Sequence, residues 1–358
     1  MGENNRKKIL HIVEAFAGGI FSILVDLVNS SCKEFDIVIA YSKRIQTPEN
    51  FKSYFASNVK FIEVENFTRN ISLKKDLKAF FEIRKIIKEE KPDIIHLHSS
   101  KAGFLGRFAA NGKKIKILYN PHGFSFLMQD SSKLKRKIYW LIEKIGAFRK
   151  CTIVGCSQGE YEEALKLSKN SICINNGLNV KKLQNETKNF KTKDIDFKKL
   201  NICTSGRIGY QKNPELFNKI AENFPEFKFT WIGDGDLKNK LTSKNINITG
   251  WKTRDEVLEF VNENDIFILT SLWEGLPVSL LEAMYLSKVC IVTDCIGNRD
   301  VIKDGENGFI INEENYKNVI QNLNNTVCQK VSKKAKQDIL DEFNVQKMAE
   351  EYRREYYG

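Results

Sequence analysis

One stretch of this chain, residues 270–294, most constrains the fold, because it reads as the end of a buried strand, a glycine turn, a helix and a second strand in direct succession. The preceding run DIFILT has the length and the β-branched residues of an interior strand. Gly275 and Pro277 lie where the loop passes into the helix, and proline is tolerated in a first helical turn. We expect strands at 265–270 and 289–293 and a helix at 278–286. This order predicts parallel strands joined by a helix.

Two carboxylates flank the turn, Glu274 on the loop and Glu282 on the helix. If both residues were helical, they would lie about 12 Å apart at about 1.5 Å per residue. The backbone N–H groups of Gly275 and Leu276 lie between them, and the N-terminus of a helix binds anions. Carboxylates accept hydrogen bonds from vicinal diols. The order of acid, amides and acid therefore matches the sugar, diphosphate and ribose of a nucleoside diphosphate sugar.

The surrounding pattern S-x-x-E-G-x-P-x-x-x-x-E-A favours this binding site over two unrelated acids on a helix surface. It resembles the E-x7-E motif of the retaining GT-B glycosyltransferases of family 4, also called group 1. The runs HLHSSKAGFLGR and NPHGFSF are similar to those of bacterial capsule and O-antigen members. The resemblance implies that Glu274 contacts the donor sugar and Glu282 the ribose. It also implies a GT-B fold, in which two Rossmann-like, doubly wound parallel-sheet domains face a central cleft.

The length of 358 residues is sufficient for two domains. We assign residues 1–177 to an acceptor-binding domain and residues 178–344 to a nucleotide-sugar-binding domain, with a lysine-rich linker at 179–199. The resemblance implies that the C-terminal helix, within 345–358, packs back on the first domain. Strands alternate with helices in both halves, which predicts mainly parallel sheets. The remaining strands are expected at 8–13, 36–41, 58–64, 93–98, 115–119, 152–156, 171–175, 200–204, 227–232 and 308–311.

A glycine loop with two cations, Arg207 and Lys212, follows the strand at 200–204. Arginine offers a planar fork for phosphate oxygens and lysine a point charge, so the pair would stabilise the charge of a leaving diphosphate. The resemblance assigns them that role, and two exposed loop cations are the alternative. Further along, the resemblance places Gly250 and Trp251 at the nucleobase pocket, although Trp251 could equally pack in the core.

The sequence Gly-Asp-Gly-Asp at 233–236 invites a metal interpretation, because acidic residues can hold a divalent ion on a diphosphate. We reject it, because the turn falls at a strand–helix junction where GT-B members carry a similar turn and Asp236 suits a helix N-cap. Arg207 and Lys212 already supply positive charge. We therefore expect no metal and no cofactor.

The chain contains four histidines: His11, His96, His98 and His122. The last two fall at or beyond the carboxyl ends of expected parallel strands, where open α/β sheets bind ligands. A metal site is one interpretation, but we expect His96 and His98 to diverge, as alternate residues of a strand, and no acidic ligand accompanies them. A buried, hydrogen-bonded role suits His11 and His96. A ligand contact suits His122, which the resemblance places on the donor sugar near the reaction centre.

Gly18 and Gly19 follow the first strand and precede an apolar helix at 20–29, so they would let the backbone approach a ligand closely. The resemblance places this loop beside the donor diphosphate or the acceptor, and a simple tight turn is the alternative. Helices are also expected at 72–91 and 103–110. The segment 99–101 before the second of these is a candidate for acceptor contact.

The formal net charge of +12 requires a partner or a solvated surface. Residues 133–150 form a basic amphipathic helix, which suits the anionic surface of a membrane or an ordinary solvated face. No apolar run reaches the roughly 18–20 residues of a membrane span, and no signal peptide is expected. The eight scattered cysteines favour buried thiols in a reducing compartment. We expect a cytoplasmic protein, bound peripherally to the inner face of the cell membrane and not to nucleic acid.

These features predict a retaining, metal-independent hexosyltransferase for surface polysaccharide synthesis. The resemblance implies a UDP-sugar donor and a glycan acceptor on a polyprenyl diphosphate lipid. A glycoside hydrolase is disfavoured, because its two carboxyl groups would need to lie about 5–5.5 Å apart. A sugar-nucleotide isomerase of the 2-epimerase type and a non-catalytic membrane scaffold are the rival interpretations. The sequence leaves the donor sugar, its base, the linkage and the oligomeric state open.

Overall fold

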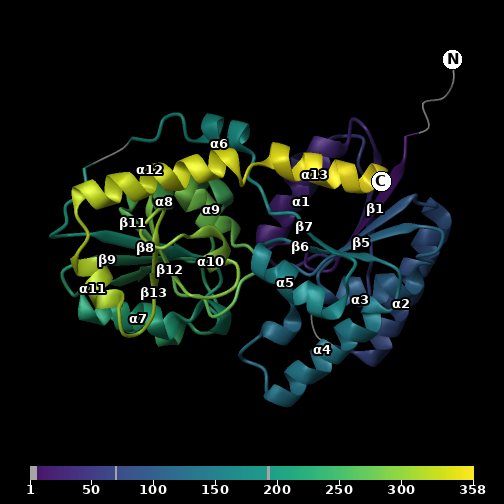
Figure 1. Ribbon diagram of the computed structural model, residues 1–358, viewed down its shortest axis with the longest axis horizontal. Coiled ribbons are helices and arrows are strands. Elements are labelled where there is room, and N and C mark those ends of the chain that lie inside the picture. The colour runs from purple at the N-terminus through teal and green to yellow at the C-terminus, as the bar shows by residue number, and fades with distance from the viewer. Residues whose placement is uncertain (1–5, 69–70, 192–193) are drawn as a thin grey trace. The chain divides into compact units, whose positions relative to one another are not determined.

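The computed structural model of the protein describes residues 6–68, 71–191 and 194–358. The chain divides into two compact units, each built on its own parallel sheet (Figure 1). The first unit comprises Met1–Asn176 and Val345–Gly358, and the second comprises Gly177–Asn344. The boundary after Asn176 lies one residue before the one expected from the sequence.

The first unit contains a seven-stranded parallel sheet in the order β3-β2-β1-β4-β5-β6-β7. The chain order reverses between β1 and β4, so the carboxyl ends of these strands form a topological switch point, where open α/β sheets bind ligands. The strands are β1 (Lys8–Val13), β2 (Asp36–Tyr41), β3 (Lys60–Glu63), β4 (Ile94–His98), β5 (Lys116–Asn120), β6 (Thr152–Gly155) and β7 (Ser171–Cys173). The helices are α1 (Gly18–Ser31), α2 (Leu73–Glu90), α3 (Ser100–Ala109), α4 (Lys133–Ala147), α5 (Gln158–Leu167) and α13 (Val345–Tyr357), with short 3₁₀ turns at Phe51–Tyr54 and Ser125–Leu127.

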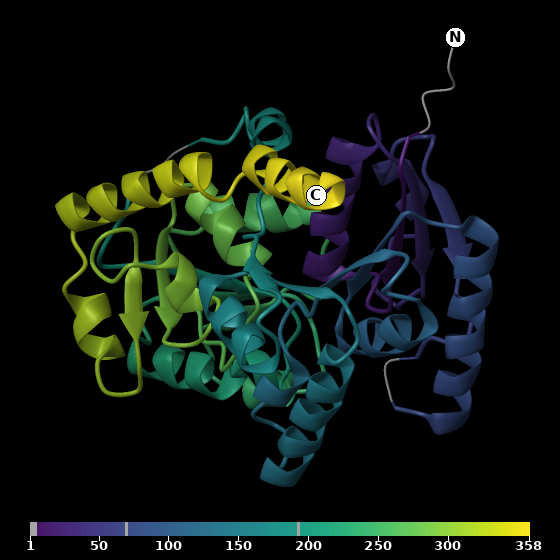
Figure 2. The ribbon, with the colours of Figure 1, turned by 45° about the vertical axis from the view of Figure 1, so that its right-hand side comes forward.

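The last helix, α13, belongs to the first unit although the second unit precedes it in the chain. It lies beside α1 in both ribbon views (Figures 1 and 2). Its buried side chains recur at the three- and four-residue spacing of one helix face, as in Met348, Tyr352 and Tyr356. The ring of Tyr356 packs against Phe35, with centroids 5.5 Å apart. The C-terminus therefore completes the core of the first unit.

The second unit contains a six-stranded parallel sheet in the order β10-β9-β8-β11-β12-β13, with its switch point between β8 and β11. All four residues of β11 are buried, as in a sheet covered on both faces. The strands are β8 (Asn201–Ser205), β9 (Lys228–Ile232), β10 (Ile246–Ile248), β11 (Ile266–Leu269), β12 (Val289–Thr293) and β13 (Phe309–Ile311). The helices are α6 (Val180–Glu186), α7 (Pro214–Asn223), α8 (Arg254–Glu263), α9 (Val278–Tyr285), α10 (Asn298–Val301), α11 (Tyr316–Gln321) and α12 (Asn325–Asp341), with 3₁₀ turns at Tyr210–Lys212 and Lys238–Lys240.

The structure differs from the expectations at the starts of α6, α3 and α1. The expected linker at 179–199 contains α6, which begins where the Asn179 side chain accepts a hydrogen bond from the Lys182 N–H at 3.1 Å. Helix α3 begins at Ser100, three residues before the expected start. Helix α1 begins at Gly18, so the expected glycine turn is the first turn of the helix.

Candidate active site

Glu274 lies in the loop that joins β11 to α9, at the switch point of the second unit. Its side chain is buried and accepts three hydrogen bonds. Lys212 Nζ donates to Oε1 at 2.8 Å, Ser271 Oγ donates to the same oxygen at 2.7 Å, and Gln211 Nε2 donates to Oε2 at 3.3 Å. A carboxylate bonded to a cation and two neutral donors is held in one orientation.

The loop after β8 brings Lys212 to Glu274, because hydrogen bonds join it to the loop after β11. Thr270 Oγ1 donates to the Lys212 carbonyl at 2.7 Å, and the Leu272 N–H donates to the Gln211 carbonyl at 2.8 Å. The neighbouring strands β8 and β11 end side by side, so their loops meet. The two predicted residues Lys212 and Glu274, which lie 62 positions apart, are thereby brought into direct contact.

A glycine supports Glu274 from the loop after β12. The Glu274 N–H donates to the Ile296 carbonyl at 3.2 Å, and Gly297 has a positive φ of 85°. A Cβ atom at Gly297 would lie 2.7 Å from the Gly275 carbonyl oxygen, so only glycine fits this approach. The backbone of Gly275 and Leu276 leads directly into α9, as expected, with Pro277 just before the first helical residue.

Arg207, the other predicted diphosphate ligand, forms an ion pair with Asp236. Each predicted cation thus has an acidic partner, Lys212 at Glu274 and Arg207 at Asp236. The expectation that Asp236 caps a helix is wrong, because the nearest helical turn starts at Lys238 and has Leu237 at its cap position. The joint action of the two cations on a diphosphate stays a prediction.

Glu282 lies on α9 and is buried with a cation beside it. Arg254 Nε donates to Glu282 Oε1 at 2.9 Å, and the Arg254 guanidinium also binds Glu186 Oε2 at 2.9 Å. Burial raises the pKa of Glu282, and the Arg254 charge opposes that shift. Arg254 therefore sets the orientation and the charge of the carboxylate that we predicted to bind ribose.

Trp251 is 50% exposed, so the alternative that it packs in the core is wrong. It follows Gly250, which has a φ of 72° and pairs with Gly233 in an isolated bridge. An exposed indole is free to stack on a base, and its nucleobase role stays a prediction.

Gly18 and Gly19 are exposed at the N-terminus of α1 in the first unit. Gly18 has a φ of 56°, and no atom lies within 4 Å of a Cβ built there, so the backbone is accessible to a ligand. In the candidate acceptor segment, Lys101 Nζ donates to Asp76 Oδ1 at 2.8 Å and to the Thr68 carbonyl at 2.6 Å. These contacts leave the predicted acceptor role of the segment open.

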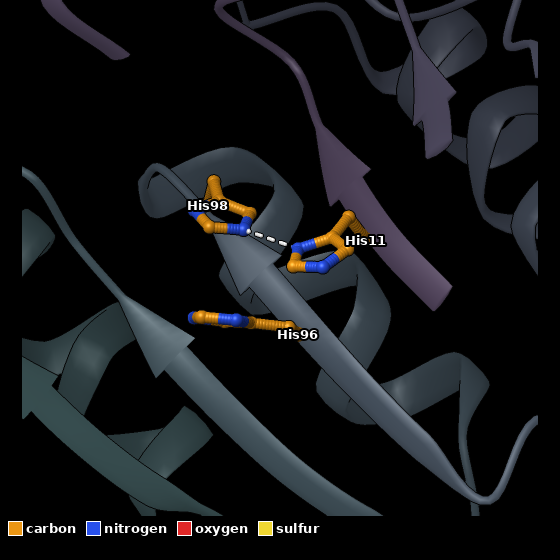
Figure 3. Close-up of side chains that lie close together, drawn as sticks. All are labelled: His11, His96 and His98. Carbon is orange, nitrogen blue, oxygen red and sulfur yellow. Dashed lines mark hydrogen bonds between the residues drawn. The ribbon is translucent and has the colours of Figure 1, made fainter. Parts of the chain in front are cut away.

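All four histidines of the chain gather at the switch point of the first unit. His11 of β1 is the register partner of His96 in β4, and Figure 3 shows both with His98. The expectation that His96 and His98 diverge is wrong, because residues two apart on a strand point to the same face. Their ring centroids lie 4.2 Å apart.

Hydrogen bonds connect these rings. His11 Nδ1 lies 3.0 Å from His98 Nε2, and His98 Nδ1 lies 3.0 Å from His122 Nε2. His96 contacts Asn120 Oδ1 through Nε2 at 2.6 Å and the Tyr356 hydroxyl through Nδ1 at 2.8 Å. His11 and His96 are thus buried and bonded, as expected.

The nitrogens of His11, His96 and His98 lie close enough together to consider a metal ion, since one ligand atom from each falls within 4.8 Å of the others. Both nitrogens of His96 already have hydrogen-bond partners, so a metal would have to displace Asn120 or Tyr356. Burial lowers the pKa of all four histidines, to about 4 for His96 and about 3 for His122. The rings are therefore neutral at physiological pH.

The loop that carries His122 is held from α5. His122 itself has a φ of 53°, and the next N–H, that of Gly123, donates to Glu160. Glu160 was not predicted from the sequence, nor were Gln211 and Arg254 as partners of the predicted carboxylates. Ser271 was within the recognised motif but had no role assigned. The other three have no local sequence signal, because their contacts join separate elements.

Comparisons with known proteins match both halves of the chain to glycosyltransferases. The family model Glycosyltransferase Family 4 matches residues 17–182, and the model Glycosyl transferases group 1 matches residues 185–338. The UDP-Gal:alpha-D-GlcNAc-diphosphoundecaprenol alpha-1,3-galactosyltransferase of Escherichia coli is 32% identical over 327 residues, which cover 82% of each chain. The GalNAc-alpha-(1->4)-GalNAc-alpha-(1->3)-diNAcBac-PP-undecaprenol alpha-1,4-N-acetyl-D-galactosaminyltransferase of Campylobacter jejuni is 26% identical over 82% of this chain and 81% of its own.

Among solved structures, sucrose-phosphate synthase from Thermosynechococcus elongatus superposes with a TM-score of 0.79 at 14% identity over 98% of both chains. This likeness, together with the two doubly wound parallel sheets, confirms the GT-B fold predicted from the sequence. The sequence matches extend through both units. The chain therefore belongs to the group 1 glycosyltransferases, the family with which its E-x7-E motif was identified.

Proposed function

We propose that this protein transfers a sugar, with retention of anomeric configuration and without a metal, from a nucleoside diphosphate donor to a glycan on a polyprenyl diphosphate. The Escherichia coli relative is named for a UDP-sugar donor and a diphosphoundecaprenol acceptor, and the Campylobacter jejuni relative for a PP-undecaprenol acceptor. UDP is accordingly the first donor nucleotide to test. The single observation that carries the proposal is the buried Lys212–Glu274 pair beside the N-terminus of α9.

The contacts in the second unit suggest how each residue acts. Glu274, oriented by Ser271 and Lys212, accepts hydrogen bonds from donor-sugar hydroxyls and is a positioning group. Lys212 and Arg207 bind the diphosphate and stabilise the charge that develops as the glycosidic bond breaks. Glu282 binds the ribose hydroxyls. With two cations at the leaving group, a divalent ion is not needed to neutralise it.

Transfer then occurs on one face of the sugar. The bond from the anomeric carbon to the diphosphate breaks, the acceptor hydroxyl attacks from the same side, and its proton passes to the departing phosphate oxygen. The products are the glycoside with retained configuration and the nucleoside diphosphate. Glu274 takes no proton in this scheme, which is compatible with its hydrogen bonds to three donors.

The acceptor lipid requires a membrane surface, and α4 has the properties to bind one. Among the described residues, no helix is both long and apolar enough to span a bilayer. Helix α4 instead exposes apolar side chains beside lysines, including Leu134 at 70% and Leu141 at 53% exposure. Its inner side is fixed by the buried pair of Glu143 and Arg107, with Arg107 Nη2 donating at 2.7 Å. An amphipathic, basic helix held in this way suits the anionic inner face of the cell membrane.

The test is a transfer assay with purified protein, UDP-hexoses and UDP-N-acetylhexosamines as donors, and a synthetic polyprenyl diphosphate sugar as acceptor. We expect one donor to give a product with the α configuration of the donor, with EDTA leaving the rate unchanged. A β-linked product would contradict retention, and loss of the rate in EDTA would contradict metal independence. Conversion of the donor without acceptor into an epimer would favour the isomerase alternative.

A further inference from the structure

The histidines of the first unit form a line that ends at the residue predicted to contact the donor sugar. His11 and His98 are buried, whereas His122 is partly exposed on the loop after β5. His98 uses both ring nitrogens, one toward His11 and one toward His122, at 3.0 Å each. His122 therefore has one nitrogen, Nε2, bonded inward and one, Nδ1, left for a ligand. We call His11, His98 and His122 the histidine line.

Neutral rings restrict where the protons of this line can be. A neutral imidazole carries a single N–H, so one nitrogen donates and the other accepts. If His98 carries its proton on Nδ1, it donates to His122 and must accept from His11. All three rings then carry the proton on Nδ1. If His98 carries it on Nε2, it donates to His11 and accepts from His122, and all three carry it on Nε2. Mixed arrangements place two donors or two acceptors face to face.

The two arrangements differ at the outer end of the line. With protons on Nδ1, His122 offers an N–H donor to a ligand. With protons on Nε2, His122 offers a lone-pair acceptor to the same ligand. The state of the outer nitrogen thus depends on His11, which does not touch His122. An orienting partner of this kind fixes a functional histidine in other sites.

We propose that His98 and His11 are positioning residues that set which hydrogen-bonding role His122 presents to the donor sugar. The inference rests on the proposed function only for the identity of the ligand, because the coupling itself follows from the geometry. His98 acts directly on His122, and His11 acts through His98. Neither is a catalytic residue, since neither reaches the ligand.

His96 belongs to the same cluster but not to the line. Asn120 Oδ1 accepts its Nε2 proton, so its Nδ1 accepts from the Tyr356 hydroxyl, and its tautomer is fixed separately. The Tyr352 hydroxyl completes this branch by accepting from Asn120 Nδ2 at 2.8 Å. The branch provides a matched control, because its groups are equally buried and lie beside the line without joining it.

The titratable groups around the line agree with neutral rings. Tyr352 and Tyr356 reach the cluster from α13, and burial raises the pKa of both hydroxyls, so they stay protonated. From α5, Glu160 accepts hydrogen bonds from the backbone N–H groups of Gly123 and Cys156. Burial lowers the pKa of His98, and the neighbouring histidines lower it further.

The direct test is nitrogen NMR of the whole protein labelled with ¹⁵N-histidine, which gives only eight ring signals. We expect His11, His98 and His122 to carry their protons on the same-named nitrogen, either all Nδ1 or all Nε2, with His96 on Nε2. We also expect none of the four to titrate between pH 5 and 8. Mixed tautomers in the line, a cationic ring at pH 7, or shifts caused by added Zn²⁺ at equimolar concentration would overturn the proposal.

Variants test whether the coupling matters to His122. His11→Leu removes the partner of His98. The His122 ring signals should then move toward values averaged over the two tautomers. The kcat should fall about tenfold or more, within the 10–100-fold loss typical when a partner that orients a histidine is removed. Donor affinity, measured by calorimetry, should change by less than about threefold, because His11 makes no ligand contact. His11→Asn, which restores a hydrogen-bonding group near the Nδ1 position, should recover both readouts. Tyr356→Phe should alter neither.

The coupling of the histidines and the transfer of a sugar can fail independently in these experiments. Unchanged His122 signals in His11→Leu, or an equal change in Tyr356→Phe, would overturn the coupling. The tautomer pattern of the wild-type protein decides the question even if His11→Leu fails to fold. Matched tautomers in a protein that transfers no sugar would leave the histidine line standing and count against the transferase proposal alone.

Discussion

At the switch point of the first unit four histidines are held neutral, whereas at that of the second unit buried carboxylates are paired with cations. The four histidines, with lowered pKa values, bond to one another and to hydroxyl and amide groups. In the second unit, Lys212 binds Glu274 and Arg254 binds Glu282. Both sheets are parallel and doubly wound, so the fold does not dictate this difference.

The difference corresponds to what each site is predicted to bind. A diphosphate needs cations, and a buried cation needs an acidic partner. A sugar hydroxyl is neutral and needs only well-oriented donors and acceptors, which neutral imidazoles provide. The predicted donor site of the second unit thus consists of paired charges, whereas the histidine cluster of the first unit consists of neutral rings oriented by hydrogen bonds.

Mild acid should produce the largest effect and should act on the first unit. In the unfolded chain the histidines take up protons below about pH 6.5, while the folded chain keeps them neutral, so the unfolded state binds more protons and stability falls as pH falls. Each histidine lowers the free energy of unfolding by about 1.4 kcal/mol for every pH unit below 6.5, until the pH reaches the pKa of that histidine in the folded protein. For His96 that limit is about 4.

Hydrogen exchange read by mass spectrometry measures this effect separately in each unit. After correction for intrinsic rates, peptides of the first unit should lose protection between pH 6.5 and 5, and those of the second, which contains no histidine, should lose much less. Equal losses in both units would contradict the contrast between a neutral and a charged site.

Lys212→Ala should have the second-largest effect, because it removes the cation of the predicted leaving-group site. We expect kcat to fall about 100- to 1000-fold, the range for loss of a preorganised charge-stabilising group. Lys219→Ala is the matched control, since Lys219 lies in the same unit in an exposed pair with Glu313. Activity of Lys212→Ala within threefold of the control would remove Lys212 from the mechanism.

Arg254→Met should lower the free energy of unfolding by about 1–3 kcal/mol. The loss should be smaller than that from breaking a fully buried ion pair, because the Arg254 side chain keeps some solvent contact. Without its partner, the buried Glu282 carboxyl should show a still higher pKa. A folded pKa above the unfolded one means that stability falls as pH rises, so urea unfolding should show a greater loss at pH 8 than at pH 5. Adding Glu282→Gln should abolish this pH dependence. A loss equal at both pH values would argue against the pairing.

The surface of α4 should give the smallest effect. Lys137→Glu should weaken binding to vesicles that contain anionic lipid by about 2 kcal/mol, since each basic residue near such a surface contributes about 1 kcal/mol and the change reverses the charge. Donor binding in solution should be unaffected. Equal sedimentation of wild type and variant with anionic vesicles, or equal binding of the wild type to neutral ones, would refute the electrostatic contact.

Much of the fold could be predicted from the sequence, because buried parallel strands such as 8–13 and 289–293 are continuous apolar runs bounded by turn residues. The placement of Glu274 and Glu282 around the start of a helix could also be predicted, because the loop, the turn and the helix that place them are consecutive in the sequence. Helix α6 was missed, because its seven residues are polar and short and were interpreted as a linker.

What could not be predicted depends on strand register and on contacts between distant elements. His11 meets His96 only because β1 pairs with β4 in one register, and Arg254 reaches Glu186 across 68 positions. The divergence of His96 and His98 was a different kind of error, since the two-residue period of a strand places them on one face. The ligand roles of His122, Arg207 and the glycines, which the family resemblance implies, stay predictions.

The position of α13 has a consequence for biosynthesis. Tyr352 and Tyr356 supply hydroxyls to Asn120 and His96, yet the ribosome adds them only after the whole second unit. The first unit therefore cannot acquire its final interior during translation of its own strands, and it must persist in an incomplete form while the second unit is made. A premature stop codon after Asn344 would spare the whole second unit and still leave the nascent first unit unfinished, a natural substrate for chaperones and proteases.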